Sequence, residues 1–198
     1  MLCFICFINM IKHKEQRVGV FVDVSNMFFA ARKYAANLNF KAVLDAAVAG
    51  RKLIRAIAYA VESHSKEEEA FFDALEKSGF EVKLKELQIF ASGKKKADWD
   101  VGIAMDMIKM SDSLDVLILV SGDGDYIPLV EYIQNHGRLV EVLAFEDGVS
   151  AKLIERADDF TDLSKNKDKY LIKKNRQPQR EDKFMPRRGF SGNKQKGK

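Results

Sequence analysis

Aspartates follow two of the most apolar runs in this chain. Asp123 and Asp125 come just after the aliphatic run Val116–Val120, and Asp23 follows a second apolar run, Val18–Val22. Runs of this kind are typical of strands that are buried on both faces of a parallel sheet. The carboxyl ends of parallel strands meet at one edge of the sheet, which is where ligands bind in open α/β folds. We therefore expect these carboxylates to share one acidic pocket.

A helix predicted to start near Asp98–Asp100 brings further carboxylates, those of Asp98 and Asp100, to the same pocket. Two unit charges about 4 Å apart repel by about 4 kcal/mol at an effective dielectric constant near 20. Crowded carboxylates therefore need either a proton or a cation between them. Oxygen ligands suit Mg²⁺ or Mn²⁺, and these ions assist displacement at phosphorus. The sequence thus predicts a Mg²⁺ or Mn²⁺ site for phosphodiester chemistry.

The competing interpretation is that these aspartates are helix caps and turn residues, because aspartate suits both positions. One aspartate at such a turn would favour that interpretation, whereas three places converging on one edge favour a metal site. Asp106 comes six residues after Asp100, on a different face of a regular helix. The sequence places no histidine to activate Ser25 or Ser121, so neither is predicted to be a nucleophile.

A basic loop, Gly93–Ala97, precedes the helix aspartates and contains Lys94, Lys95 and Lys96. Such a run is usually a solvated loop, but its place beside the pocket favours contact with a phosphate backbone. Trp99 either packs the start of the helix onto the sheet or stacks on a base, and packing is the expected role.

Strands that alternate with helices predict βαβ units around a parallel sheet. The predicted strands are Val18–Val22, Leu53–Val61, Phe80–Leu87, Val116–Val120 and Leu139–Phe145. The predicted helices are Asn26–Ala36, Phe40–Ala49, Glu67–Lys77, about Asp100–Met110, Ile127–Asn135 and Val149–Ala157. The alternation of apolar and charged residues over Phe80–Leu87 predicts an edge strand. Ser25 or Asn26 is expected to cap the first helix, and Ser65 with Glu68 matches a capping box.

The charge of the chain is divided between an acidic body and a basic tail. Residues 165–198 contain 13 Lys or Arg and 3 Asp or Glu; subtracting these from the totals of 33 and 29 leaves 20 basic and 26 acidic residues before them. With few apolar residues, the tail is predicted to be disordered. We expect it to contact nucleic-acid phosphates; the alternative is a solubilising tail without a specific partner.

The first 16 residues form a separate N-terminal segment. Its apolar run, Met1–Ile11, is too short to span a bilayer as a helix and lacks the charged start and cleavage site of a signal peptide. We expect translation to start at Met10, with a membrane-surface anchor as the alternative. Cys3 and Cys6 form a lone Cys-x-x-Cys pair, which is weak support for metal or redox chemistry. The remaining chain has no cysteine, which fits a cytoplasmic protein. No membrane partner is expected.

Three blocks of sequence resemble the NYN domain, in the LabA-like branch of the PIN-like nucleases. They are Asp23-Val-Ser-Asn26, Lys96-Ala-Asp-Trp-Asp100 with Asp106 further on, and Ser121-Gly-Asp-Gly-Asp-Tyr126 followed by Pro128-Leu129. The resemblance covers residues 17–164, so the expected organisation is an N-terminal segment 1–16, an NYN domain 17–164 and a tail 165–198. It implies an α/β, Rossmann-like PIN-type three-layer sandwich with a central, mostly parallel five-stranded sheet.

The resemblance also implies a divalent-metal ribonuclease site. Its metal ligands and catalytic residues would be Asp23, Asp100, Asp123 and Asp125, and Asn26 would position substrate or water. Members of the family often have Lys-Gly-x-Asp where this chain has Lys96-Ala-Asp-Trp-Asp100, so Asp98 is a second candidate ligand and Asp100 is preferred. Substrate contacts are expected from the following residues: Asn26, Ser121, Lys94, Lys95 and Lys96.

The sequence therefore predicts a metal-dependent endoribonuclease that acts on RNA. A Toprim domain needs a glutamate after its first strand, and a haloacid-dehalogenase-like phosphatase needs a second carboxylate two residues after Asp23; the chain has neither. A dinucleotide-binding domain needs a glycine-rich turn there, which is also missing. The remaining alternative is a catalytically silent RNA-binding or regulatory protein with the same fold and tail. The oligomeric state is left open, a homo-oligomer included.

Overall fold

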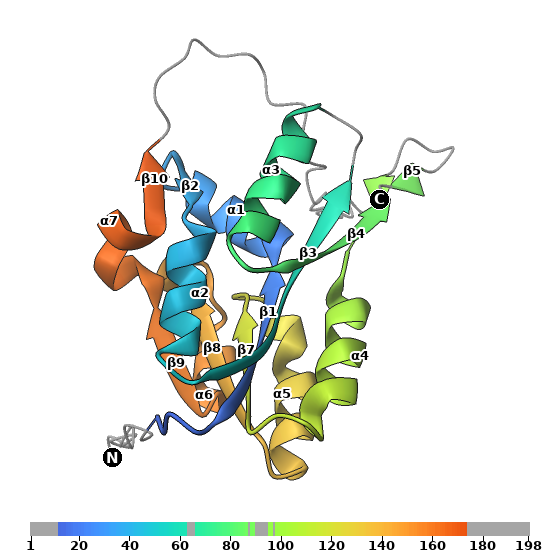
Figure 1. The fold of residues 1–198 in the computed structure, drawn as a ribbon, viewed down its shortest axis with the longest axis vertical. Helices are drawn as coiled ribbons and strands as arrows, with labels where there is room; N and C mark the ends of the chain where they lie inside the picture. Colours follow the sequence, from blue (N-terminus) through green and yellow to red (C-terminus); the bar gives the residue numbers. More distant parts are fainter. Residues whose placement is uncertain (1–11, 63–65, 87, 90–94, 97, 174–198) are drawn as a thin grey trace, which may run out of the picture.

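Parallel strands form the central sheet of this computed structural model, which describes residues 12–62, 66–86, 88–89, 95–96 and 98–173. Six strands of the described chain lie in the order β4-β3-β1-β7-β8-β9, and every neighbouring pair is parallel (Figure 1). Their bounds are β1 Arg17–Asp23, β3 Lys52–Glu62, β4 Glu81–Glu86, β7 Val116–Val120, β8 Leu139–Ala144 and β9 Asp159–Asp162. The prediction of a PIN-like α/β sandwich is confirmed.

Helices cover both faces of the sheet. On one face lie α1 (Val24–Arg32), α2 (Phe40–Val48) and α3 (Lys66–Lys77), and on the other lie α4 (Asp100–Ser111), α5 (Ile127–Asn135) and α6 (Ala151–Arg156). Successive side chains of each central strand point alternately to the two helix layers. In β1, Val20 and Val22 pack with α1 and α2, whereas Phe21 packs with α4 and α5.

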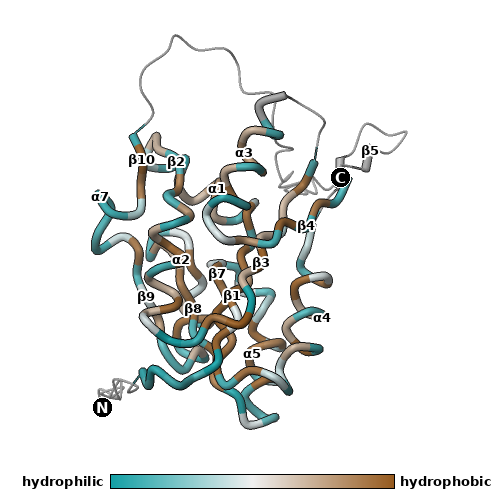
Figure 2. Tube along the Cα trace, in the orientation of Figure 1, coloured by the Kyte–Doolittle hydropathy of each residue, from teal (hydrophilic) through white to brown (hydrophobic). Residues whose placement is uncertain are grey.

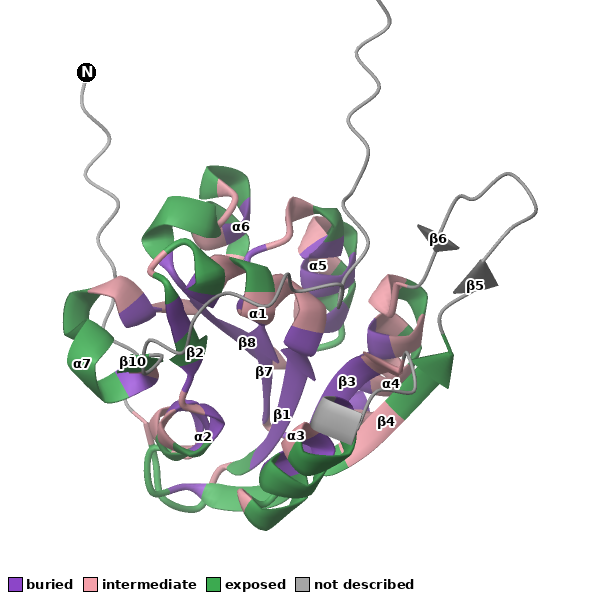
Figure 3. Ribbon diagram, turned by 90° about the horizontal axis from the view of Figure 1, so that it is seen from above, coloured by how far each residue is buried: buried purple, intermediate pink, exposed green. Residues whose placement is uncertain are grey.

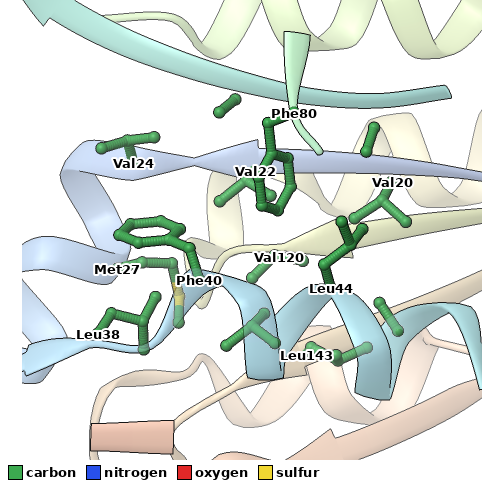
Figure 4. Packing of buried hydrophobic residues seen from close by; sticks show 14 of the residues in the cluster. Val20, Val22, Val24, Met27, Leu38, Phe40, Leu44, Phe80, Val120 and Leu143 are labelled. Atoms are coloured by element: carbon green, nitrogen blue, oxygen red, sulfur yellow. The ribbon is translucent and has the colours of Figure 1, made fainter. Parts of the chain in front are cut away.

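The first of these two cores is shown in Figure 4. Val22 of β1 and Val120 of β7 lie against Phe40 and Leu44 of α2, with Met27 of α1 beside them. Hydropathy follows the same plan, since the apolar residues gather along the strands and the polar ones on the outer helix faces (Figure 2). Burial of this apolar surface on both faces holds the strand ends, and the residues that follow them, in fixed positions.

The connections of the sheet reverse direction between β1 and β7. From β1 the chain continues outward through β3 to β4 on one side, and from β7 it continues through β8 to β9 on the other. The loops that leave β1 and β7 therefore diverge at their carboxyl ends, which is the position where ligands bind in open α/β sheets. Asp23 and the Ser121–Asp125 segment lie at this point.

The predicted five-stranded sheet is wrong by one strand. The sequence pattern does not reveal strand β9, because it has four residues and an aspartate at each end. Its support is tertiary: the backbone of β9 pairs with β8, Phe160 packs against the second core, and Asp158 Oδ2 accepts a 2.7 Å hydrogen bond from the Val140 N–H. A strand of this kind has no sequence periodicity of its own to detect.

The first predicted helix is also corrected. It begins at Val24 with Asp23 as its N-cap, rather than Ser25 or Asn26, and it ends at Arg32 rather than at Ala36. Ala35 takes a positive φ of 51°, which turns the chain into β2 (Ala36–Leu38), paired antiparallel with β10 (Leu171–Lys173).

The predicted disordered tail begins too early. Residues 165–173 are folded: α7 (Lys167–Tyr170) leads into β10, and Tyr170 is buried. The Tyr170 carbonyl accepts a 2.8 Å hydrogen bond from the Asn39 N–H. Tyr170 and Leu171 pack on the first core. The sequence pattern does not reveal them, because the surrounding residues are rich in lysine.

Several predictions fall on parts of the chain that the structure does not describe. Residues 1–11 with both cysteines, Ser65, Lys94 and residues 174–198 lie outside the described ranges. The basic loop is predicted without secondary structure, but Lys95–Lys96 form a short strand, β6, paired antiparallel with β5 (Gln88–Ile89). No helix within the described ranges is long and apolar enough to cross a membrane.

Candidate functional site

Asp23 is both the last residue of β1 and the cap of α1. Its Oδ1 accepts a 2.9 Å hydrogen bond from the Asn26 N–H, and the residue is 6% exposed. A carboxylate at this position satisfies an unpaired N–H and lies at the positive end of the helix dipole, which stabilises its charge. The Asp23 carboxylate has further oxygen lone pairs. It can therefore cap α1 and still bind a cation.

The residues after β7 form a turn whose hydrogen bonds fix Asp123. Ser121 is fully buried, and its Oγ accepts a 3.3 Å hydrogen bond from the Asp123 N–H. Asp123 caps the short 3-10 helix η1 (Gly124–Tyr126), and its Oδ1 accepts from the Asp125 N–H at 3.1 Å. Asp125 itself is exposed. The turn thus holds a half-buried Asp123 and an exposed Asp125, while the buried Ser121 supports the turn.

Gly122 lies where three segments meet. Its N–H donates to Asn26 Oδ1 at 3.0 Å, and its carbonyl accepts from the Ser150 N–H at 3.0 Å. A Cβ at this position would lie 2.7 Å from the Gly148 carbonyl oxygen. Asn26, predicted to position substrate or water, uses its side-chain oxygen to tie α1 to the β7 turn. The spacing between Asp23 and the Asp123 turn is therefore fixed by direct bonds.

Tyr126 is bonded to Asp100 and lies within electrostatic reach of Asp23 and Asp123. It is almost fully buried, and its hydroxyl donates a 3.2 Å hydrogen bond to Asp100 Oδ1. Burial raises the pKa of the Tyr126 phenol, and the negative charges of Asp23, Asp100 and Asp123 raise it further. Three carboxylates from β1, α4 and the β7 turn thus act on a single hydroxyl, which stays protonated. These three carboxylates are among those that the sequence predicts to share an acidic pocket.

Tyr126 has no predicted role. The sequence signal is its position directly after Asp125, within the Ser121–Tyr126 block, but a tyrosine there also fits as an ordinary core residue. Only the fold shows that its polar end reaches Asp100.

The two helix aspartates differ in position. Asp100 is the first residue of α4 and accepts from Tyr126. At Asp98, one residue before the cap of α4, the backbone carbonyl accepts a 2.9 Å hydrogen bond from Lys85 Nζ. The contact with Tyr126 supports Asp100 as the α4 member of the acidic cluster, which we define as Asp23, Asp100 and Asp123.

Asp106 belongs to a separate polar group further along α4. Its Oδ2 accepts from the Tyr59 hydroxyl at 2.8 Å and from Lys83 Nζ at 2.6 Å. Burial alone would raise the pKa of Asp106, but the hydrogen bonds from Lys83 and Tyr59 outweigh it and the pKa is lowered. The carboxylate is thus ionised and already bonded by two donors.

Trp99 packs the start of α4 onto the sheet, as predicted. Its Nε1–H donates a 2.7 Å hydrogen bond to the Ala60 carbonyl, and its ring meets Tyr59 edge-on at 5.3 Å between centroids. Of the predicted phosphate-binding lysines, Lys95 and Lys96 lie in β6, and Lys94 lies outside the described residues.

The acidic cluster has the right donor chemistry for a divalent cation but not a complete ligand set. Among the side chains that the structure describes, no three of the types His, Cys, Asp and Glu are close enough together to hold a metal ion unaided. Mg²⁺ in proteins commonly takes one or two carboxylates and keeps several waters or substrate oxygens. The aspartates near Tyr126 fit that mode of binding.

The site lies at the end of the sheet toward which β1 points, where α1 starts (Figures 1 and 3).

The chain is similar to proteins that are already known. The chain is 27% identical over 175 residues to the Low amplitude and bright protein LabA of Synechococcus elongatus, covering 84% of this chain and 92% of LabA. It is also similar to the crystal structure of VPA0982, a protein of unknown function from Vibrio parahaemolyticus RIMD 2210633. That match has a TM-score of 0.74 and 34% sequence identity, and it covers 82% of this chain and all of the other.

The NYN domain family matches residues 17–164, which contain the whole sheet and all three members of the acidic cluster. With this match and with LabA among its relatives, the chain belongs to the NYN domain family, in its LabA-like branch.

Proposed function

We propose that this protein is a metal-dependent endoribonuclease whose centre is the acidic cluster. The observation that carries the proposal is that the buried Tyr126 hydroxyl donates to Asp100 and has its pKa raised by the charges of Asp23, Asp100 and Asp123, at the switch point of an NYN domain. Crowded carboxylates in such a place are stabilised by a cation, and the family resemblance to PIN-like nucleases supplies the substrate class.

Carboxylate oxygens of the cluster would hold Mg²⁺ or Mn²⁺. When bound, such an ion supplies Lewis acidity to a phosphodiester and lowers the pKa of water. Tyr126 donates its only proton to Asp100 and so orients that carboxylate. Asp125 is exposed at the rim, where it can accept a hydrogen bond from substrate or from water. Asp98, next to the start of α4, is the further acidic residue that we assign to the mouth of the site.

RNA would be held by cations outside the cluster. We assign this role to the lysine arm, Lys94, Lys95 and Lys96, and to the basic tail, because phosphate contacts dominate nucleic-acid affinity. Asn26 and Ser121 support the site through the backbone of the β7 turn. We place the activity in the cytoplasm, since residues 12–198 contain no cysteine.

The second candidate is a catalytically silent RNA-binding or regulatory protein. It is favoured by one observation: within the described ranges, the acidic residues do not form a preassembled three-ligand site. In this case the fold and tail would bind RNA, and the cluster would serve only to cap α1 and η1.

The experiment is cleavage of a labelled RNA pool with Mn²⁺, Mg²⁺ or EDTA, using wild type, Asp123→Asn and the matched control Asp112→Asn. Asp112 is an exposed aspartate at the far end of α4. We expect cutting that needs the metal, is retained in Asp112→Asn and is lost in Asp123→Asn. RNA binding without cutting by the wild type would favour the silent protein.

A further inference from the structure

An exposed phenylalanine, Phe29, lies on α1, the helix that Asp23 of the acidic cluster caps. Phe29 is 43% exposed, although full burial of a phenylalanine side chain typically contributes about 1.5–3 kcal/mol. It lies on the side of α1 opposite to the buried residues Val24, Met27 and Ala31. The fold thus leaves an aromatic ring partly uncovered within two helical turns of Asp23, which caps the same helix.

The neighbours of Phe29 place it at the rim of the site. One turn before it, Asn26 Oδ1 accepts from the Gly122 N–H of the β7 turn. One turn after it, Lys33 Nζ donates a 3.0 Å hydrogen bond to the Asp147 carbonyl, in the 3-10 helix η2 (Glu146–Gly148) that follows β8. Residues three and four apart share one side of a helix. Phe29 therefore lies between two contacts that α1 makes with the loops of the site.

The surroundings of Phe29 are aromatic and cationic. The Phe28 ring meets Phe29 edge-on, with 5.8 Å between centroids, and the Arg32 guanidinium carbon lies 5.7 Å from the centroid of Phe28. Aromatic rings and arginine side chains are the groups on which single-stranded nucleic acids stack their bases. In a duplex the base faces already stack on each other, so a surface ring cannot use them in the same way.

We propose that Phe29, with Phe28 and Arg32 beside it, stacks an unpaired base of single-stranded RNA at the rim of the acidic cluster, beside the phosphate that a cation bound there would hold. The inference rests on the proposed function and specifies its substrate as single-stranded. The six residues from Asp23 to Phe29 rise about 9 Å along the helix axis, a distance that a base close to the bound phosphate can span. The base would lie over Phe29 and its phosphate would face the cluster.

The test is equilibrium binding in EDTA, so that RNA is not cut, to a labelled single-stranded oligonucleotide and to the same sequence in a duplex. We expect Phe29→Ala to weaken single-strand binding about 5- to 150-fold and duplex binding less than twofold. Phe29→Trp should retain single-strand binding, and Phe29→Leu, which keeps apolar volume, should behave like Phe29→Ala. Ile54→Ala is the matched control, because Ile54 is 47% exposed near the start of β3, at the other end of the sheet.

The salt dependence gives a second measurement. Phe29→Ala removes no charge, so the slope of log affinity against log salt should match that of the wild type. Equal losses on single strand and duplex, or no loss on either, would overturn the inference. So would a change in self-association by sedimentation at unchanged RNA affinity, since it would assign the ring to a second copy of the chain.

The failure of this inference can be distinguished from failure of the proposed function. Cleavage that depends on Asp123 but not on Phe29 would refute the stacking site and leave the nuclease intact. Phe29-dependent binding of single strands without any metal-dependent cutting would retain the stacking site and refute the nuclease. A wild type that binds no RNA would refute both.

Discussion

Replacing Gly122 by alanine tests how the site is held together. The added Cβ would lie 2.7 Å from the Gly148 carbonyl oxygen and 3.0 Å from the Val149 Cα. Both are backbone atoms, so no side-chain rotation can relieve the contact. Either the β7 turn or the segment after η2 must move, and the movement strains the hydrogen bonds of Gly122 with Asn26 and Ser150.

The expected cost follows from these contacts. Overpacking of this kind costs about 1–3 kcal/mol, and each weakened hydrogen bond about 0.5–1.5 kcal/mol. We expect Gly122→Ala to lower the free energy of unfolding by about 2–6 kcal/mol, measured by urea denaturation. The matched control is Gly137→Ala. Gly137 has a φ of +76°, and no described atom lies within 4 Å of the place where its Cβ would be, so the cost there is only backbone strain, about 1–2 kcal/mol.

Function should fall more than stability in Gly122→Ala. The β7 turn carries Asp123, so a displaced turn separates that carboxylate from Tyr126 and Asp100. Under conditions where the variant remains folded, we expect weaker Mn²⁺ binding, whereas Gly137→Ala should bind Mn²⁺ as the wild type does. The reasoning is refuted if the two variants are equally stable and bind Mn²⁺ equally.

Three further predictions concern stability and the tail. Glu141→Gln should lower the free energy of unfolding by about 3–5 kcal/mol, because it leaves Arg51 buried without its charge partner; replacing both residues by Met and Leu should restore most of this loss. Arg17 lowers the pKa of Asp115 to about 2, so its contribution is complete above the ordinary value of 3.8 and is lost toward pH 2; acid unfolding should show the advantage over Asp115→Asn shrinking there. Removal of residues 174–198 should weaken RNA binding and reduce its salt slope, and an unchanged slope would contradict the role given to the tail.

The sequence predicts the position of the candidate site because two apolar runs also determine where their strands end. The runs Val18–Val22 and Val116–Val120 are almost uniformly apolar because both faces of β1 and β7 are buried. In a parallel sheet this fixes where their carboxyl ends lie, so the convergence of Asp23 and Asp123 could be predicted without coordinates. The predicted start of a helix added Asp98 and Asp100, and the resemblance added the preference for Asp100, which no periodicity distinguishes from Asp98.

What the sequence did not predict depends on partners far away in the chain. Strand β9 forms because it pairs with the edge of β8, and β10 forms because it pairs with β2. Tyr126 is a buried ring whose polar role exists only because α4 brings Asp100 to it. Asn26 is predicted to position substrate or water, and the sequence does not show that its side-chain oxygen accepts a hydrogen bond from a glycine 96 residues away. Such contacts leave no local signal.

The central claim is that the acidic cluster binds a divalent cation, and calorimetric titration with Mn²⁺ tests it most directly. The comparison uses wild type, Asp100→Asn and, as the matched variant two residues away, Asp98→Asn. We expect the wild type and Asp98→Asn to bind Mn²⁺ and Asp100→Asn to lose at least about tenfold in affinity. Absence of binding by the wild type, or equal binding by wild type and Asp100→Asn, would contradict the account.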